Sequence, residues 1–248
     1  MKKMAGFDEK SGEFEGKKRR AATNVKKSAG YARFGQSIRY MTWNEWLRFL
    51  DSIDSYPHKL MFRMIYELGC RVGEFVRIQL GDVDFRRGRV FFPRENTKTG
   101  QWRTSHFSEG LGNELKSWLK ANGRMGIRSE AVKRPREYLF SPRGDWRRRY
   151  SENRVRQVFR HYLEKAGMVR VYGRDACGRL LYELTVHSLR HSHVIHFIHI
   201  HKLPIAVVQK QVGHTSLKTT SVYLNPSEEA VSEAYRSVRS VDGRATRG

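Results

Sequence analysis

The chain has 248 residues, which is enough for one hydrophobic core with tails. Its 48 Lys and Arg against 25 Asp and Glu give a net charge of +23 at pH 7, which favours a polyanionic partner, because cations that neutralise phosphates release condensed counterions. No apolar run approaches the roughly 20 residues that cross a bilayer, which argues against a membrane protein. The two cysteines form neither a disulfide framework nor a C-x-x-C pair. Composition therefore predicts an intracellular protein that binds nucleic acid.

The N-terminal region changes character near residue 38. Residues 1–37 contain clusters of Lys and Arg separated by Gly, Ser and Ala, without an apolar period, which predicts a flexible basic tail. This tail is either a solvated appendage or an arm that follows DNA. Thr42 and Glu45 then form a capping box, and Trp46 and Leu47 belong to the apolar stripe of the helix that follows.

The middle of the chain alternates helices with two short hairpins. A helix is expected from Pro57 to Gly69, and a small antiparallel sheet over residues 83–107 with its turn at N-T-K-T-G. Ser108 and Ser151 are expected to cap the next two helices. A second hairpin is predicted over residues 169–184, turning at D-A-C-G-R.

The C-terminal part is expected to be helical, with boundaries at Pro204, Gly213 and Pro226. Tyr223 lies on the helix between the last two boundaries, and another helix is expected to follow Pro226. Helices with two small hairpins and no βαβ alternation predict an α+β fold that is mostly helical.

Two pairs of residues in this part suggest a phosphate site. His187 and Arg190, three positions apart, project from one face of a helix. Arg presents planar, bidentate donors that suit phosphate. His214 lies nine positions before Tyr223. An H-x-x-R pair alone is weak evidence, because such pairs occur often by chance and commonly serve surface ion pairs.

Together the motifs resemble the tyrosine recombinase (phage-type integrase) family, over roughly residues 40–226. The family has a motif around its first arginine, matched here by G-C-R-V-G-E at 69–74, and a lysine on a hairpin turn, matched by T-K-T-G at 97–100. Its signature is H-x-L-R-H, then G-H, then T-T-x-x-Y. These are matched by H-S-L-R-H at 187–191, G-H at 213–214 and T-T-S-V-Y at 219–223. Any one of these motifs is common, but all five in order are specific.

The resemblance implies a catalytic set consisting of Arg71, Lys98, His187, Arg190, His214 and Tyr223. Tyr223 would attack a DNA phosphodiester while the two arginines neutralise its oxygens and His187 accepts the tyrosine proton. His214 would bind the scissile phosphate. The product is a 3′-phosphotyrosyl link, which conserves the bond energy, so that no ATP is required.

Roles are also expected for Lys98, Glu74 and His191. Lys98 is expected to protonate the leaving 5′ oxygen, although Arg94 and Arg103 flank the same turn and remain alternatives. Glu74 is expected to orient the arginines and His191 to buttress the site. The histidines at 187–201 include no H-E-x-x-H and have no nearby cysteine pair, so neither a metal nor another cofactor is expected.

These observations predict a site-specific DNA recombinase or integrase that acts on double-stranded DNA as a homotetramer. The expected organisation is a basic tail (1–37), a catalytic domain (38–226) and a C-terminal helix and tail (227–248) exchanged between protomers, as the resemblance implies. The family's helical core-binding domain is not matched, so the chain is a catalytic fragment or uses its tail or an accessory DNA-binding protein. The expected location is the cytoplasm of a prokaryotic or viral host, in association with the nucleoid. Alternatives are a type IB topoisomerase-like enzyme, a telomere resolvase and a DNA-binding protein without catalysis.

Overall fold

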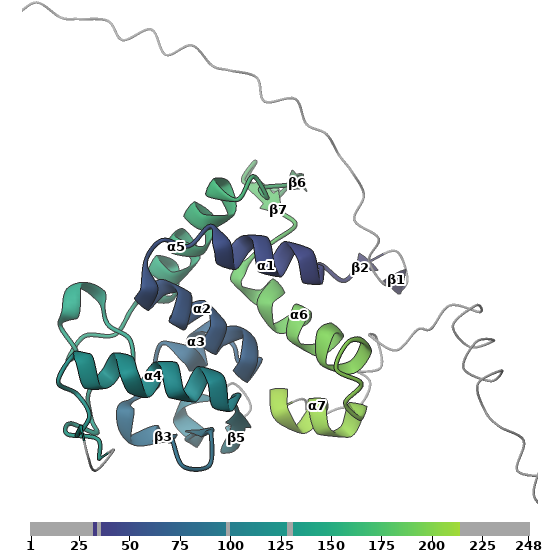
Figure 1. The fold of residues 1–248 in the computed structure, drawn as a ribbon. Coiled ribbons are helices and arrows are strands. Elements are labelled where there is room, and N and C mark those ends of the chain that lie inside the picture. The colour runs from purple at the N-terminus through teal and green to yellow at the C-terminus, as the bar shows by residue number, and fades with distance from the viewer. Residues whose placement is uncertain (1–31, 34–35, 98–99, 128–130, 214–248) are drawn as a thin grey trace, which may run out of the picture.

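The structure, a computed structural model, describes residues 32–33, 36–97, 100–127 and 131–213 (Figure 1). Its helices are α1 (Trp43–Asp51), α2 (Tyr56–Leu68), α3 (Val72–Phe75), α4 (Glu109–Ala121), α5 (Glu152–Lys165), α6 (Val186–His199) and α7 (Ile205–Val212). Its strands are β1 (Ala32–Arg33), β2 (Gln36–Ser37), β3 (Val83–Asp84), β4 (Arg89–Phe92), β5 (Arg103–His106), β6 (Val171–Arg174) and β7 (Leu180–Tyr182). Short 3-10 turns lie at η1 (Leu80–Asp82), η2 (Arg94–Asn96) and η3 (Pro142–Gly144).

The predicted α+β class, mostly helical with small antiparallel sheets, is confirmed. Strands β3, β4 and β5 form one antiparallel sheet in that order, and β6 pairs with β7 in a separate hairpin. Helix α2 packs between α4 and α6, while α7 packs against both α6 and β5 (Figure 1). None of the described helices is long and apolar enough to cross a membrane.

Helix boundaries follow the capping residues that the sequence predicted. The Thr42 amide donates to Glu45 Oε2 at 2.9 Å, and the Glu45 amide donates to Thr42 Oγ1 at 3.3 Å, which completes the capping box of α1. Ser108 and Ser151 accept hydrogen bonds from the first turns of α4 and α5. Each cap satisfies a backbone N–H that the helix itself cannot pair.

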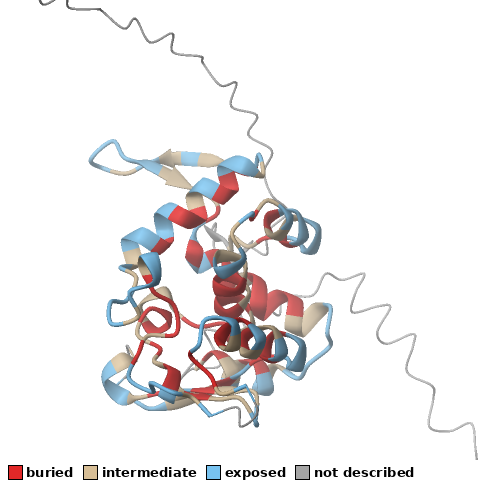
Figure 2. Cartoon of the chain, turned by 60° about the vertical axis from the view of Figure 1, so that its left-hand side comes forward, coloured by how far each residue is buried: buried red, intermediate tan, exposed pale blue. Residues whose placement is uncertain are grey.

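Helix α6 is buried over much of its length, from Val186 to His196, and Figure 2 shows buried positions gathered in the middle of the molecule. Two of its buried polar side chains pair with the segment that precedes α1 and with α2. Ser192 Oγ accepts from the Met41 amide at 2.8 Å, and His196 lies between the Tyr66 hydroxyl and the Met41 carbonyl, both at 2.9 Å. These bonds fix the start of α1 against α6.

One residue in the apolar stripe of the first helix lies outside the core. Helical spacing placed Leu47 in the stripe of α1, and its side chain is 43% exposed. Leu47 instead lines an apolar groove of about 990 Å³ bounded by residues of α1, α2, α6 and α7. The apolar stripe of α1 therefore faces the core in part and this groove in part.

Candidate active site

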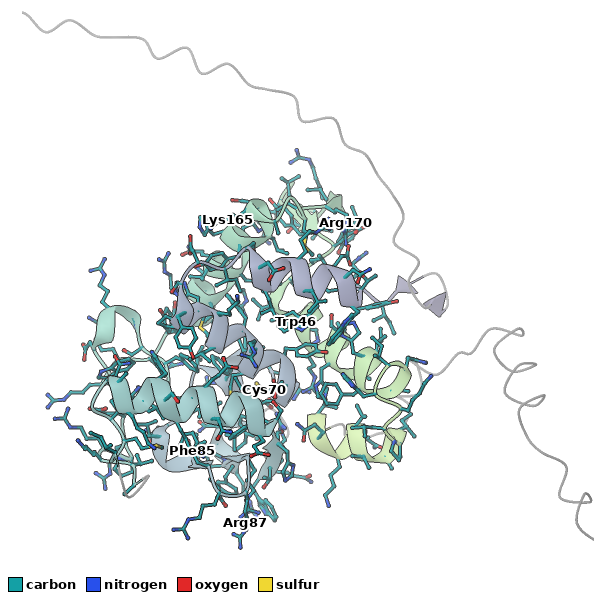
Figure 3. All side chains as sticks on the ribbon, in the orientation of Figure 1. Trp46, Cys70, Phe85, Arg87, Lys165 and Arg170 are labelled. Atoms are coloured by element: carbon teal, nitrogen blue, oxygen red, sulfur yellow. The ribbon has the colours of Figure 1, made fainter. Side chains whose placement is uncertain are left out.

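Gly69 ends α2 and turns the chain toward Arg71. Its φ of +54° lies in the left-handed region, and a Cβ there would lie 2.7 Å from Val212 Cγ1 and 2.9 Å from His193 Cδ2. Glycine is therefore required for both conformation and space. Cys70, labelled in Figure 3, follows within the core. Burial and the Glu74 charge raise the pKa of the Cys70 thiol to about 12, so it packs as a neutral side chain.

Arg71 and Glu74 lie together at the start of α3. Glu74 is 3% exposed; its Oε2 accepts from the Arg71 amide at 2.9 Å, and its Oε1 lies 3.1 Å from Arg71 Nη1. Burial opposes ionisation of Glu74. However, the Arg103 guanidinium and then the Arg71 amide and guanidinium hold the pKa of the carboxyl below its usual value. Glu74 is thus ionised, and its contact with Nη1 fixes the orientation of the Arg71 guanidinium.

Arg190 reaches the same turn from α6. It is 2% exposed, and its Nη1 donates to the Gly69 carbonyl at 2.6 Å. Its Nη2 is buried without a hydrogen-bond partner among the described residues. Burial and the nearby charges of Arg71 and Arg103 lower the pKa of Arg190 to about 10, so the guanidinium is still a cation at neutral pH. A buried, unpaired donor on a cation favours an anionic ligand.

His187 lies in the first turn of α6 and lines the rim of a pocket. Partial burial, with the positive charges of Arg190 and Arg71, lowers the pKa of its imidazole, which is therefore neutral at pH 7. Its ring lies edge-on to the His191 ring, with 4.6 Å between centroids. A neutral imidazole beside two arginines can accept a proton.

The pocket itself has a volume of about 580 Å³ and is bordered by four elements. Arg71 caps the start of α3 and Glu74 lies within it, His187 comes from α6, and Glu152 and Arg156 come from α5. Thr97, the residue after η2, also lines the pocket.

Three of the six predicted catalytic residues cannot be placed in this geometry. Lys98 follows Thr97 directly but lies outside the described residues, as do His214 and Tyr223. The described chain ends at Gly213, the residue before His214. The structure therefore brings together Arg71, His187 and Arg190, and carries the chain to the positions next to Lys98 and His214.

Arg103 occupies a position that the sequence pattern alone did not predict. It was an alternative to Lys98, yet its side chain is only 11% exposed and turns inward from β5. Its Nη2 lies 2.7 Å from Glu74 Oε2, and its guanidinium stacks over the Phe92 ring at 4.2 Å. The alternation of side chains along β5 could have predicted this inward direction, because Arg103 lies on the same face as buried Ser105 and pairs in register with buried Phe92. Arg94, the other alternative, is exposed on η2.

Comparison with known proteins identifies the family. The sequence profile of the Phage integrase family matches residues 39–230. Tyrosine recombinase XerA of Pyrococcus furiosus is 26% identical over 183 residues, which cover 73% of this chain and 54% of that protein. The chain spans about half the length of the curated relatives it matches.

Solved structures with the same fold include DNA complexes. The Tn1549 transposon integrase, in complex with a circular intermediate DNA, has a TM-score of 0.62 at 14% identity, covering 82% of this chain and 67% of that one. A lambda integrase tetramer bound to a Holliday junction has a TM-score of 0.50 at 18% identity, covering 75% and 50%. With a family match that extends over most of its length, this chain belongs to the phage integrase family.

Proposed function

We propose that the chain is the catalytic part of a DNA recombinase that exchanges strands through a 3′-phosphotyrosyl intermediate. The convergence of Arg71, Arg190 and His187, far apart in sequence, around one turn at Gly69 carries the proposal. The relatives named as tyrosine recombinases support it.

In the proposed reaction the Tyr223 oxygen forms a bond to the scissile phosphorus while the bond to the 5′ oxygen breaks. His187 takes the tyrosine proton, and Lys98 gives a proton to the departing 5′ oxygen. Rejoining reverses these steps, with a 5′-hydroxyl attacking the phosphotyrosine. One phosphate ester replaces another, so the exchange requires no nucleotide hydrolysis.

Side-chain cations would neutralise the pentavalent transition state. The unpartnered Nη2 of Arg190 and the Arg71 guanidinium are the proposed donors to the non-bridging oxygens, and His214 is proposed to join them. Loss of one such donor costs about 3–4 kcal/mol of barrier. Glu74 fixes the Arg71 guanidinium without entering the reaction, and His191 supports the His187 ring.

The proposed partners are double-stranded DNA, within the nucleoid of its host, and further copies of the chain. The net charge of +23 supports the first. The apolar groove supports the second, because Trp43, Leu47, Leu203 and Val207 line it and are 37–51% exposed. We propose that the segment after Pro226 of a neighbouring protomer covers this groove in a tetramer. An accessory DNA-binding protein is proposed as a further partner.

A covalent capture experiment tests the function and does not require the target sequence to be known. The protein is incubated with a library of duplexes, each with a randomised core and a nick next to that core. Cleavage near the nick releases a short fragment that diffuses away, so the protein cannot rejoin the strand and stays attached to the DNA. Protein-linked DNA that survives denaturation is expected, and its sequence gives the target. No adduct from the library would contradict the proposal. A two-site plasmid assay with the selected target then separates recombination from relaxation alone, the topoisomerase-like alternative.

A further inference from the structure

Arg103 is a buried cation that reaches three parts of the site at once. We infer that it is a positioning residue, which holds Arg71 and the backbone of Gly213, the residue before His214, in the arrangement needed at the phosphate. The inference rests on the proposed function, because it concerns that reaction. With a side chain only 11% exposed, Arg103 is too deep to lie along a DNA backbone. Its effect must pass through the groups that it binds.

The first of these groups is Glu74. Glu74 Oε2 lies 2.7 Å from Arg103 Nη2, while Oε1 lies 3.1 Å from Arg71 Nη1. One carboxylate is therefore shared between two arginines. Without Arg103, both carboxylate oxygens would be left to Arg71, which would turn its guanidinium toward Glu74 and weaken its positive charge at the pocket. Arg103 keeps Arg71 available by occupying the second oxygen.

The second group is the end of α7. Arg103 Nη1 donates to the Gln211 carbonyl at 3.0 Å, and Ser105 Oγ donates to the same oxygen at 2.7 Å. The last carbonyls of a helix lack partners within the helix and favour cationic donors. The Gln211 side chain adds two bonds to the backbone of His106, at 2.9 and 2.6 Å. Strand β5 thus terminates α7 and fixes where the chain leaves it.

The third contact is with Gly213, immediately before His214. Gly213 has a φ of +70°, and a Cβ there would lie 2.6 Å from Arg103 Cδ. The backbone that leads to His214 therefore rests directly on the Arg103 stem. The forked guanidinium is necessary, because Nη2 and Nη1 bind Glu74 and Gln211 at the same time; a lysine ammonium has one nitrogen and cannot span both.

The test compares single-turnover cleavage of the selected nicked duplex at saturating DNA. Arg103→Gln is expected to slow cleavage about 100-fold, since a displacement of about 1 Å of a clamp group has this effect. Arg103→Lys keeps the charge and is expected to be about 10-fold slower than wild type. The dissociation constant for DNA is expected to stay within about threefold, because Arg103 makes no phosphate contact. Arg170→Gln is the matched control: Arg170, near the top of Figure 3 and away from Cys70, is likewise paired with two carboxylates, those of Glu45 and Glu183. It is expected to cleave at the wild-type rate.

A leaving-group substitution distinguishes positioning of the phosphate clamp from other effects. With sulfur in place of the bridging 5′ oxygen, the leaving thiolate needs no proton. The Arg103→Gln defect is expected to be equally large on this substrate, whereas a Lys98→Met defect is expected to disappear. Rescue of Arg103→Gln by sulfur, or wild-type rates for Arg103→Lys, would overturn the inference. So would loss of folding in both Arg103 variants under conditions where Arg170→Gln folds, because the role would then be structural.

These results separate the inference from the proposed function. If wild-type protein forms no adduct, the function itself fails. If wild type forms the adduct and Arg103→Gln forms it equally fast, the function stands and the positioning role is wrong.

Discussion

Arg190 Nη1 donates a 2.6 Å hydrogen bond to the carbonyl of Gly69, two residues before Arg71. This single bond ties the helix that carries His187 to the turn that presents Arg71. Because Gly69 also contacts α7 and α6 through the space that its missing side chain leaves, the turn is the point at which the separate motifs meet.

Gly69→Ala is expected to destabilise the fold by about 2–4 kcal/mol, from left-handed backbone strain and a clash with Val212 and His193. Gly167→Ala is the control. Gly167 also follows a helix and has a φ of +65°, but no atom lies within 4 Å of the added Cβ, so a loss of only about 1 kcal/mol is expected. Urea denaturation of both variants measures the difference, and equal losses would contradict the packing role of Gly69.

Cleavage is expected to persist below pH 6.5. Burial and the charges of Arg190 and Arg71 lower the pKa of His187, and a proton acceptor with a lowered pKa stays neutral further into the acid range. The second-order rate at subsaturating DNA reports the free protein, so its acid limb should have a midpoint below pH 6.5 and be lost in His187→Gln. A midpoint at or above 6.5 would contradict a lowered pKa of the His187 imidazole.

Stability is expected to fall as the pH drops from 6.5 toward 4. His193 and His196 are buried, and burial lowers their pKa values to about 3 and about 4. Below pH 6.5 these two histidines are protonated in the unfolded chain but stay neutral in the folded chain. Each therefore lowers the free energy of unfolding by about 1 kcal/mol per pH unit. His193→Asn should remove about half of this slope, whatever its stability at pH 7. A slope unchanged in this variant, measured by denaturation at pH 5, 6 and 7, would exclude His193 as a source.

Val207→Glu is expected to weaken assembly on DNA by about 100-fold, because a charge would replace an apolar group in the groove that we propose a neighbouring protomer covers. Ile127→Glu is the control, since Ile127 is 81% exposed and does not line the groove. Sedimentation of the two variants with two-site DNA measures assembly. Equal behaviour would place the interface elsewhere.

Much of the fold follows from local sequence rules. The capping residues Thr42, Ser108 and Ser151 and the left-handed glycines marked the helix ends correctly, because each of these features depends on a few neighbouring backbone groups. The hairpins at β4–β5 and β6–β7 were also predictable from alternation and turn composition.

The site was only partly predictable, because its shared contacts join distant segments. A motif could nominate Arg71, but not the Glu74 carboxylate shared with Arg103, which depends on how β5 faces α3. Arg103 was grouped with Lys98 because of its place near the turn, whereas its pairing opposite Phe92 directs it inward. Leu47 was placed in an apolar stripe, and helical spacing alone does not distinguish the part of a stripe that faces the core from the part that faces an open groove.

The residue that becomes joined to DNA distinguishes this mechanism from every other. Wild-type protein and Tyr223→Phe are incubated with the selected nicked duplex, and any adduct is digested with protease and nuclease and analysed by mass spectrometry. The expected product is a nucleotide linked through its 3′ phosphate to the peptide that contains Tyr223, and no adduct is expected with Tyr223→Phe. An adduct that persists in Tyr223→Phe, or a nucleotide on any other residue, would contradict it.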